Sequence, residues 1–293
     1  MTDGASPRVV KTRAELRTAL SAAARPIGLV PTMGALHEGH ASLIRRARAE
    51  NATVLVSIFV NPRQFNETAD FLQYPRDEAA DVKAAGVAGA DLIWMPGITD
   101  VYPAGFQTNV HVELLTRPLE GASRPGHFEG VATVVAILLG LAGADRAYLG
   151  QKDAQQLLVV RRMAADLGIA TEIVACPIVR EPDGLALSSR NVRLTREQRA
   201  AAPVLRRALL AARDRYGAGE RDGDALRAAM RDVLAGEPLA VPDYVSCADH
   251  ETLSEVARVE GPVLLSLAVR FGPVRLIDNE PLPYVSGRGR REP

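Results

Sequence analysis

Two histidines three residues apart carry the clearest chemical signal in the sequence. His37 and His40 follow the short apolar segment 27–30 and a turn that contains Gly34, and they lie where a helix is predicted to begin. The N-terminus of a helix presents unpaired N–H groups and the positive end of the helix dipole, which together attract an anion. The H-x-x-H spacing differs from the i, i+4 spacing of a zincin metal site. The pattern therefore predicts a site for the phosphates of a nucleotide, although helix capping is the simpler alternative.

Two further segments carry groups that suit phosphate binding. Residues 150–153 (Gly-Gln-Lys-Asp) follow an apolar run and open a predicted helix. Lys152 can neutralise phosphate charge there, and Asp153 can accept hydrogen bonds from ribose hydroxyls or helix N–H groups. Residues 187–190 (Leu-Ser-Ser-Arg) offer two hydroxyls and a guanidinium, which can wrap around the β- and γ-phosphates. Taken alone, the first segment also fits a plain N-cap and the second an interdomain linker.

Neutral amides near the same predicted strand ends suit a different ligand. Asn61 and Gln64 lie in the stretch Asn-Pro-Arg-Gln-Phe, and Gln155 and Gln156 lie near the start of a predicted helix. An amide both donates and accepts hydrogen bonds, as recognition of a small hydroxylated carboxylate requires. Arg124 adds a guanidinium on a glycine-containing loop. Ordinary loop and helix-surface roles are the alternative for the amides, and a turn with an exposed arginine is the alternative for Arg124.

The bulk composition narrows the class of protein. The 293 residues include 47% hydrophobic residues, enough for a substantial core, and 35 basic side chains balance 35 acidic ones. This balance predicts neither a nucleic-acid nor a membrane partner, so any anion site must be local. Two widely spaced cysteines form no C-x-x-C pattern, which is typical of a reducing cytoplasm. No secretory signal is predicted, and the longest apolar run, 131–144, is shorter than the roughly 20 residues of a membrane span.

The elements that must position these groups alternate between strands and helices. This alternation predicts an α/β fold with a doubly wound, Rossmann-like parallel sheet over residues 1–179. The rhythm breaks at a turn near residue 180, and residues 180–293 are predicted to form a smaller α+β domain that carries the Ser-Ser-Arg loop as a lid. The predicted strands are 27–30, 53–59, 91–95, 146–149, 171–175, 244–248, 263–269 and 274–277. The predicted helices are 39–49, 77–85, 131–141, 154–167, 195–215 and 222–234.

Most of the polar segments directly follow predicted strands. Ligands of doubly wound sheets bind beyond the carboxyl ends of the strands, at the point where the strand order reverses. We therefore expect these segments to converge on one crevice. The sequence has neither a Walker lysine motif nor a G-x-G-x-x-G motif nor a Ser/His/Asp triad signature. A nucleotide-binding enzyme with this sequence must therefore hold ATP by other means.

Six segments in order resemble the pantoate–β-alanine ligase (pantothenate synthetase) family. This family belongs to the nucleotidyltransferase superfamily that pairs a HIGH-type motif with a later KMSKS-type loop. Here His37-Glu38-Gly39-His40 takes the first role and Leu187-Ser188-Ser189-Arg190 the second. The matching segments are VPTMGALHEGH (30–40), SIFVNPRQF (57–65), YPRD (74–77), SRPGHFEGV (123–131), GQKDAQQL (150–157) and REPDGLALSSRN (180–191).

The resemblance implies an ATP-dependent ligase. The reaction would condense (R)-pantoate with β-alanine to pantothenate through a pantoyl adenylate, releasing AMP and pyrophosphate. ATP would be a substrate, and Mg²⁺ would be held mainly through its phosphates rather than by protein ligands. The resemblance also implies a homodimer, and together with the composition it predicts a cytoplasmic protein without nucleic-acid or membrane partners.

The resemblance also assigns site residues. The catalytic set would be His37, His40, Lys152, Ser188, Ser189 and Arg190, with the proton-donor role on His40. Gln64 and Gln156 would hold pantoate, with Asn61 and Arg124 nearby. The ATP contacts would come from Met33, Gly34, Ala35, Leu36, His37, Glu38, Gly39, His40, Gly150, Gln151, Lys152, Asp153, Val179, Leu187, Ser188, Ser189 and Arg190.

The sequence departs from the family pattern at several positions. Gln151 stands where Glu is common, Ala154 where Tyr is common, and both Leu187 and Arg63 where Met is common. Ala80 replaces one member of a frequent acidic pair. These changes remove no proposed catalytic group, but they bear on local packing, ATP affinity and metal retention.

Two other functions remain open at this stage. An adenylyltransferase of the same superfamily would share the ATP elements but need extra basic groups for a phosphate-bearing acceptor, whereas Gln64 and Gln156 favour a carboxylate. A non-catalytic nucleotide sensor or RNA-binding relative of aminoacyl-tRNA synthetases is disfavoured by the balanced charge and by the presence of both His40 and Lys152.

Overall fold

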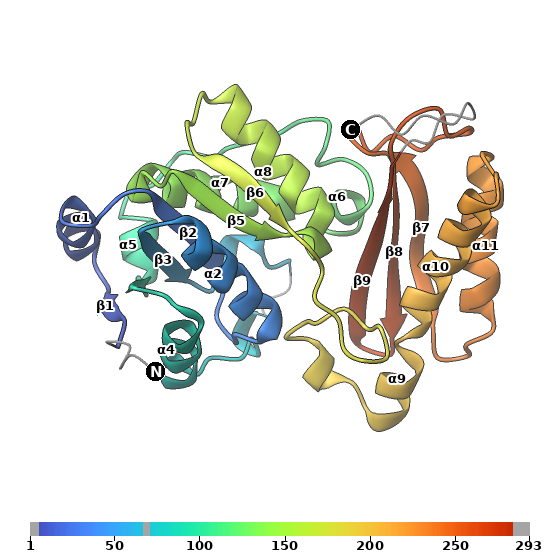
Figure 1. The fold of residues 1–293 in the computed structure, drawn as a ribbon, viewed down its shortest axis with the longest axis horizontal. Helices are drawn as coiled ribbons and strands as arrows, with labels where there is room; N and C mark the ends of the chain where they lie inside the picture. Colours follow the sequence, from blue (N-terminus) through green and yellow to red (C-terminus); the bar gives the residue numbers. More distant parts are fainter. Residues whose placement is uncertain (1–5, 67–70, 284–293) are drawn as a thin grey trace. The chain divides into compact units, whose positions relative to one another are not determined.

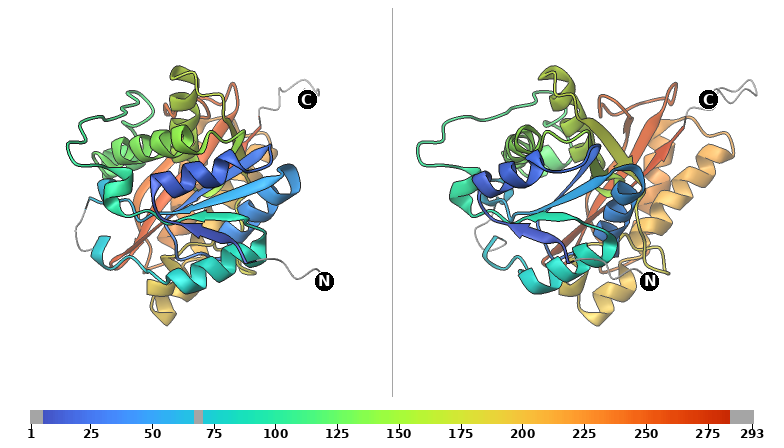
Figure 2. Two further views of the ribbon diagram at one scale, coloured as in Figure 1. Left: turned by 90° about the vertical axis from the view of Figure 1, so that its left-hand side faces the viewer. Right: turned by 60° about the vertical axis from the view of Figure 1, so that its left-hand side comes forward.

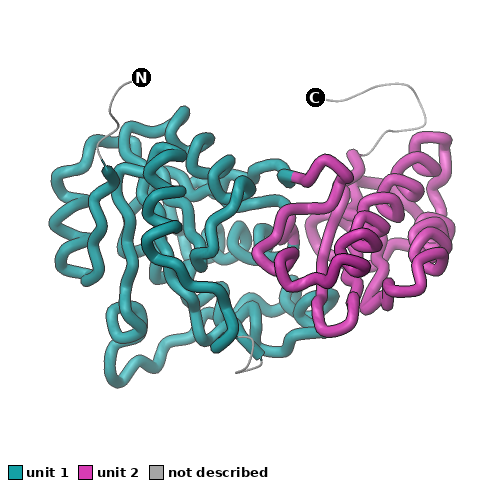
Figure 3. The backbone as a smooth tube through the Cα atoms, turned by 90° about the horizontal axis from the view of Figure 1, so that it is seen from below, with its two compact units in different colours: residues 1–151, 155–179 teal, residues 152–154, 180–293 magenta. Residues whose placement is uncertain are grey.

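The computed structural model describes residues 6–66 and 71–283. The chain forms two compact units, residues 1–151 with 155–179 and residues 152–154 with 180–293 (Figure 3). The short segment 152–154 thus groups with the C-terminal unit although it lies far before it in sequence. Within the described residues no helix is long and apolar enough to cross a membrane.

The N-terminal unit is built on a six-stranded parallel sheet (Figure 1). Its strands are β1 (Arg8–Val10), β2 (Ile27–Thr32), β3 (Thr53–Ile58), β4 (Leu92–Trp94), β5 (Arg146–Gly150) and β6 (Glu172–Cys176). They lie in the order β1-β4-β3-β2-β5-β6, and every residue of β3 is buried. A parallel strand buried on both faces reads as a continuous apolar run, which is why TVLVSI forms the middle of the sheet. The predicted doubly wound parallel sheet is confirmed.

Helices cover both faces of this sheet (Figure 2). Helices α2 and α4 pack together, and their buried residues join those of β3 in one core cluster that includes Ile44, Val54 and Ala85. Helices α1 and α7 also contact one another. The helices are α1 (Arg13–Ser21), α2 (Glu38–Glu50), α4 (Glu78–Ala88), α5 (Ile98–Val101), α6 (Glu120–Ser123), α7 (His127–Ala142) and α8 (Ala154–Asp166), with 3₁₀ turns η1 (Pro62–Gln64) and η2 (Gln151–Asp153).

The strand order identifies the switch point of the sheet. From β2 the chain moves outward through β3 and β4 and then returns to β5 on the other side of β2. The reversal therefore lies between β2 and β5, the position where doubly wound folds bind ligands. The histidine-containing segment follows β2 directly, and the segment Gly-Gln-Lys-Asp begins at the last residue of β5.

The C-terminal unit combines two long helices with a three-stranded antiparallel sheet in the order β7-β8-β9. Its core joins apolar residues of helices and strands, among them Leu209, Met230 and Leu267. The elements are η3 (Asn191–Arg193), α9 (Arg196–Ala201), α10 (Val204–Gly217), α11 (Gly223–Ala235), β7 (Val241–Asp249), β8 (Val263–Phe271) and β9 (Val274–Leu282). The predicted α+β class of this half agrees with the observed elements.

Several element boundaries differ from the prediction. The predicted helix 195–215 is wrong as one helix: it divides into α9 and α10 around Pro203, which lacks the N–H that a continuous helix needs. Helix α7 begins at His127 rather than at residue 131, after Gly126 with a φ of 80°. The prediction also omitted β1 and α1, and it shortened β7 and β9.

Candidate functional site

The two histidines cap helix α2 together. His37 is the N-cap residue, and its Nδ1 accepts a hydrogen bond from the N–H of Gly39 at 3.1 Å. The Nδ1 of His40 accepts in turn from the N–H of His37 at 3.3 Å. The ring centroids lie 4.2 Å apart. The pair therefore satisfies helix N–H groups in the way a Ser/Glu capping box does, with imidazoles in both roles.

These hydrogen bonds select one tautomer for each ring. A backbone N–H can only donate, so Nδ1 of both His37 and His40 carries a lone pair. A neutral imidazole must then carry its proton on Nε2. A second proton on Nδ1 would break the cap and face the positive end of the helix dipole. Helix α2 thus favours two neutral rings with Nε2–H donors, a chemistry that fits phosphate oxygens.

The loop between β2 and α2 is held by a buried carboxylate that the sequence analysis missed. Asp81 of helix α4 is 4% exposed and accepts the N–H groups of Ala35 at 3.0 Å and Leu36 at 2.7 Å. A Cβ on Gly34, whose φ is 84°, would lie 2.7 Å from Asp81 Oδ2. Glycine is therefore required both by the backbone angle and by the close carboxylate. The available signal was an aspartate one turn into a helix, next to the departure at Ala80.

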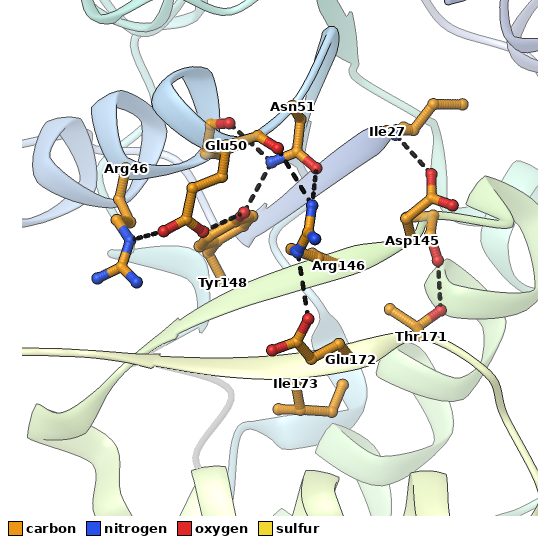
Figure 4. A network of polar contacts seen from close by, with 12 residues as sticks. Ile27, Arg46, Glu50, Asn51, Asp145, Arg146, Tyr148, Thr171, Glu172 and Ile173 are labelled. Carbon is orange, nitrogen blue, oxygen red and sulfur yellow. Dashed lines mark hydrogen bonds and ion pairs between the residues drawn. The ribbon is translucent and has the colours of Figure 1, made fainter. Parts of the chain in front are cut away.

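The other end of α2 is fixed by a buried polar network (Figure 4). The hydroxyl of Tyr148 on β5 donates to the carboxylate of Glu50 at 2.8 Å and accepts from the amide of Asn51 at 2.7 Å. Burial raises the pKa of Tyr148 to about 12, so the phenol remains a donor at neutral pH. The Tyr148 hydrogen bond is the main cause that lowers the pKa of Glu50. The helix that carries the histidines is therefore held at both ends.

The predicted substrate residues Asn61 and Gln64 contact each other. Asn61 Nδ2 donates to Gln64 Oε1 at 3.0 Å and to the carbonyl of Gly130 at 3.1 Å. Asn61 Oδ1 accepts from the N–H of Arg63 at 3.2 Å and from the hydroxyl of Tyr102 at 2.8 Å. A carbonyl only accepts and a backbone N–H only donates, so the orientation of the Asn61 amide is unambiguous. Gln64 is thereby left with Nε2 as the donor group for a ligand.

Gln64 lines a cavity of about 270 Å³. The lining residues are Arg63, Gln64, Phe65, Asn66, Pro125, Gly126, His127, Glu129 and Gly130. This volume is close to the lower end of the range for small-ligand pockets. The carbonyl of Gln64 accepts from His127 Nδ1 at 2.8 Å and from Arg124 Nη2 at 3.2 Å. Arg124, predicted to touch substrate, thus contacts the backbone of Gln64, another predicted substrate residue, and His127, which the prediction left out, does the same.

Helix α7 and the turn η1 pack without space for a side chain at Gly130. A Cβ there would lie 2.3 Å from the carbonyl oxygen of Arg63 and 2.8 Å from the nitrogen of Gln64. The Arg63 guanidinium lies over the ring of Tyr102, 5.2 Å from its centroid, and over that of Phe106 at 5.3 Å. Arg63, one of the departures from the expected family pattern, therefore stacks on two aromatic rings.

The other predicted site residues of the N-terminal unit differ in how far they are buried and in what they contact. Gln155 is 5% exposed, and its amide bonds the carbonyls of Leu115 and Pro118 and the N–H of Glu120, so it orders that loop. Gln156, the neighbour that we assign to substrate, is half-buried. Glu38 is exposed and paired with Arg45, which is a surface arrangement. Met33, Gly150, Gln151 and Val179 are half-buried.

The C-terminal unit contains the remaining predicted phosphate ligands. Lys152 Nζ lies 3.7 Å from Asp153 Oδ1, and the lysine side chain is 19% exposed. Ser188 Oγ accepts the N–H of Arg190 at 3.2 Å, which makes the Ser-Ser-Arg segment a serine turn. Leu187 and Ser189 are half-buried. Across the described residues, no group of three His, Cys, Asp or Glu side chains is placed to hold a metal ion.

Comparisons with known proteins match this architecture over nearly the whole chain. The family model of pantoate-beta-alanine ligase matches residues 8–281. The pantothenate synthetase of Roseiflexus sp. (strain RS-1) is 58% identical over 272 residues, covering 93% of this chain and 98% of the relative. That of Chloroflexus aggregans is 58% identical over 274 residues, with the same coverage.

Solved structures agree with the sequence comparisons. Pantothenate synthetase from Thermus thermophilus is 49% identical with a TM-score of 0.89, covering 93% of this chain and 98% of that one. Pantoate-beta-alanine ligase from Francisella tularensis, solved with β-γ ATP and β-alanine, is 34% identical with a TM-score of 0.77, covering 94% and 97%. The chain therefore belongs to the pantoate–β-alanine ligase family.

Proposed function

We propose that this protein condenses (R)-pantoate with β-alanine, using ATP and releasing AMP and pyrophosphate. The observation that carries the proposal is the histidine pair that caps α2 with both Nδ1 atoms accepting, in a chain that matches the family over residues 8–281. A neutral pair with Nε2–H donors is suited to a triphosphate. The N-terminal unit would bind ATP and pantoate, and the C-terminal unit would act as a lid that supplies further phosphate ligands.

In the first step a carboxylate oxygen of pantoate attacks the α-phosphorus, and the bond from that phosphorus to pyrophosphate breaks. The step needs no protein nucleophile, but the leaving pyrophosphate needs donors and positive charge. His37 and His40 would donate hydrogen bonds through Nε2 to the leaving pyrophosphate. Lys152 would add a point charge, and the segment Ser188–Arg190 would contact the outer phosphates.

In the second step the amine of β-alanine attacks the acyl carbon of the adenylate, and the bond to AMP breaks. The amine loses a proton as the amide forms. Gln64 Nε2, fixed by Asn61, would orient an oxygen of pantoate for both steps. Gln156 would add a second amide, and Arg124 would act through the Gln64 carbonyl that it contacts. Excluding water would protect the adenylate from hydrolysis.

Mg²⁺ would accompany ATP in this site, because it commonly keeps several waters and binds through substrate phosphates. When bound, it would neutralise charge on the triphosphate. We also propose a cytoplasmic homodimer. The family resemblance supports the dimer, and the two buried free cysteines, Cys176 and Cys247, support a reducing compartment.

Isotope exchange between ATP and pyrophosphate tests the proposed function. With pantoate present and β-alanine omitted, we expect rapid exchange, because adenylate formation is then reversible and stops at the first step. Without pantoate we expect none. An exchange rate that is the same with and without pantoate would contradict the mechanism. An adenylyltransferase would retain AMP in its product, so release of free AMP on addition of β-alanine separates the two functions.

A further inference from the structure

Strand β9 of the C-terminal unit holds the backbone of Lys152. Asn279, near the middle of β9, is 3% exposed, and its Nδ2 donates to the carbonyl oxygen of Lys152 at 2.9 Å. Both residues belong to the C-terminal unit, because segment 152–154 groups with it. A buried amide that bonds a backbone carbonyl on a distant segment fixes that segment, since leaving either group unsatisfied has a large energetic cost.

The neighbouring residue of β9 holds the base of the Ser-Ser-Arg segment. Asp278 is 2% exposed and binds both terminal nitrogens of Arg180, at 2.6 and 2.9 Å. Arg180 also donates to the carbonyl of Gly184 at 3.0 Å, and it pairs with Ala186 in a short antiparallel bridge. The turn closed in this way leads directly into the segment Ser188–Arg190.

Successive side chains of a strand point to opposite faces, so one strand can support two segments at once. Asp278 lies on the same face of β9 as Leu276 and Leu282, which belong to the core of this unit. The next residue, Asn279, points to the other face. Through these two side chains β9 connects the lysine and the serine–arginine turn, which come from separate parts of the chain, within one compact unit.

We propose that Asn279 is a positioning residue that places Lys152 for adenylate formation, with β9 as the common support of both phosphate-binding segments. The proposal rests on the proposed function. A lysine is a point charge on a flexible stem, so its reach is set by where its backbone is held. Displacement of a catalytic group by about 1 Å lowers rates by up to about a hundredfold.

The test is a double-mutant cycle on the rate of ATP/pyrophosphate exchange with pantoate. We expect Asn279→Ala to lower the exchange rate by about tenfold or more. In a Lys152→Ala background the same substitution should cause no further loss, because its effect acts through that lysine. Full additivity of the two losses, or an Asn279→Ala enzyme with wild-type exchange, would overturn the proposal.

Two more variants separate positioning from general stability. Asn279→Leu keeps the approximate size of the side chain but has no hydrogen-bond donor, so it should lose as much exchange as Asn279→Ala while remaining folded. Ser266→Ala is the matched control: Ser266 pairs with Asn279 in register on β8, is 6% exposed, and its Oγ has no hydrogen-bond partner among the described residues. Its exchange should equal that of the wild type.

Circular dichroism and thermal unfolding accompany each variant. If both Asn279 variants unfold, Asn279 is a residue of the folding core and the positioning role is wrong. If the wild-type protein shows no pantoate-dependent exchange, the proposed function fails instead. A wild-type protein that exchanges normally, beside an unaffected Asn279→Ala, refutes only the positioning role.

Discussion

Each unit of this protein uses a buried aspartate to hold a loop that carries candidate catalytic groups, but the two aspartates differ in their partners. In the N-terminal unit Asp81 accepts two backbone N–H groups of the loop before His37. In the C-terminal unit Asp278 forms a two-contact ion pair with Arg180, and it also accepts the N–H of Asn279 at 2.8 Å. The carboxylate of Asp81 is bound by two peptide N–H groups, and that of Asp278 by the positive charge of Arg180 in addition to one peptide N–H group.

This difference determines which hydrogen-bond donors and positive charges each loop can present to a ligand. The N–H groups of Ala35 and Leu36 point to Asp81, so they are not available to phosphate, and donation from this loop falls to the imidazole Nε2 atoms. In the C-terminal unit the positive charge of Arg180 is neutralised by its ion pair with Asp278. Among the residues of that unit predicted to bind phosphate, Lys152 and Arg190 are the ones with a positive charge. The comparison predicts that the first aspartate affects mainly activity and the second mainly stability.

The largest expected effect is on stability, at Asp278. Asp278→Ala leaves the mostly buried guanidinium of Arg180 without its partner, and loss of one partner of a buried pair typically destabilises by about 3 to 5 kcal/mol. Denaturant unfolding measures the change. The double variant Arg180→Met/Asp278→Leu should recover much of the loss, because two apolar groups leave no charge unpaired. If Asp278→Ala lowered the free energy of unfolding by less than about 1 kcal/mol, the predicted difference between Asp278 and Asp81 would be contradicted.

Asp81→Ala should lower the free energy of unfolding by about 1 to 3 kcal/mol, which is less than the loss expected for Asp278→Ala. It should lower the rate of ATP/pyrophosphate exchange by more than Asp278→Ala does. The two N–H groups lose their acceptor, and the loop that leads to His37 loses its anchor. Asp77→Ala is the control on the same helix: Asp77 accepts the N–H of Ala80 at 3.0 Å as the N-cap of α4. It should lose about 1 kcal/mol of stability and no exchange activity. Equal exchange rates in the two variants would contradict a specific role for Asp81.

Gly130→Ala should displace the turn that carries Gln64, because the new Cβ meets backbone atoms. We expect a destabilisation of about 1 to 3 kcal/mol and a raised KM for pantoate with a smaller change in KM for ATP. Gly140→Ala on the same helix meets no atom within 4 Å and should stabilise by up to about 1 kcal/mol. If Gly130→Ala and Gly140→Ala have the same stability and the same KM for pantoate, the close contact at Gly130 does not position Gln64.

The smallest effect is expected at Tyr102. Tyr102→Phe removes the hydroxyl that donates to Asn61 Oδ1, a loss of about 1 kcal/mol. The KM for pantoate should rise about fivefold. Burial raises the pKa of Tyr102 to about 12, so the wild-type hydrogen bond persists to high pH and the ratio of the two KM values should be constant between pH 6 and 9. A ratio that changes across this range would contradict a protonated phenol.

The sequence predicted the sheet better than it predicted the ends of the helices. Strands such as TVLVSI are buried on both faces, so their composition alone marks them. The break at Pro203 and the early start of α7 depend on single backbone positions, where a glycine or proline decides between helix and turn. Asp81 and Asn279 lie 45 or more residues from the segments they hold, so no local pattern could connect them.

The sequence by itself determined the α/β class, the position of the histidine pair at the start of a helix, and the segments that carry amides and cations. These follow from local periodicity and from residue chemistry. Only the tertiary structure decided which nitrogen of each imidazole carries the proton, which end of the Gln64 amide is the donor, and which buried side chains hold the loops. Those features depend on hydrogen-bond partners brought together by folding, and a pattern along the chain does not contain them.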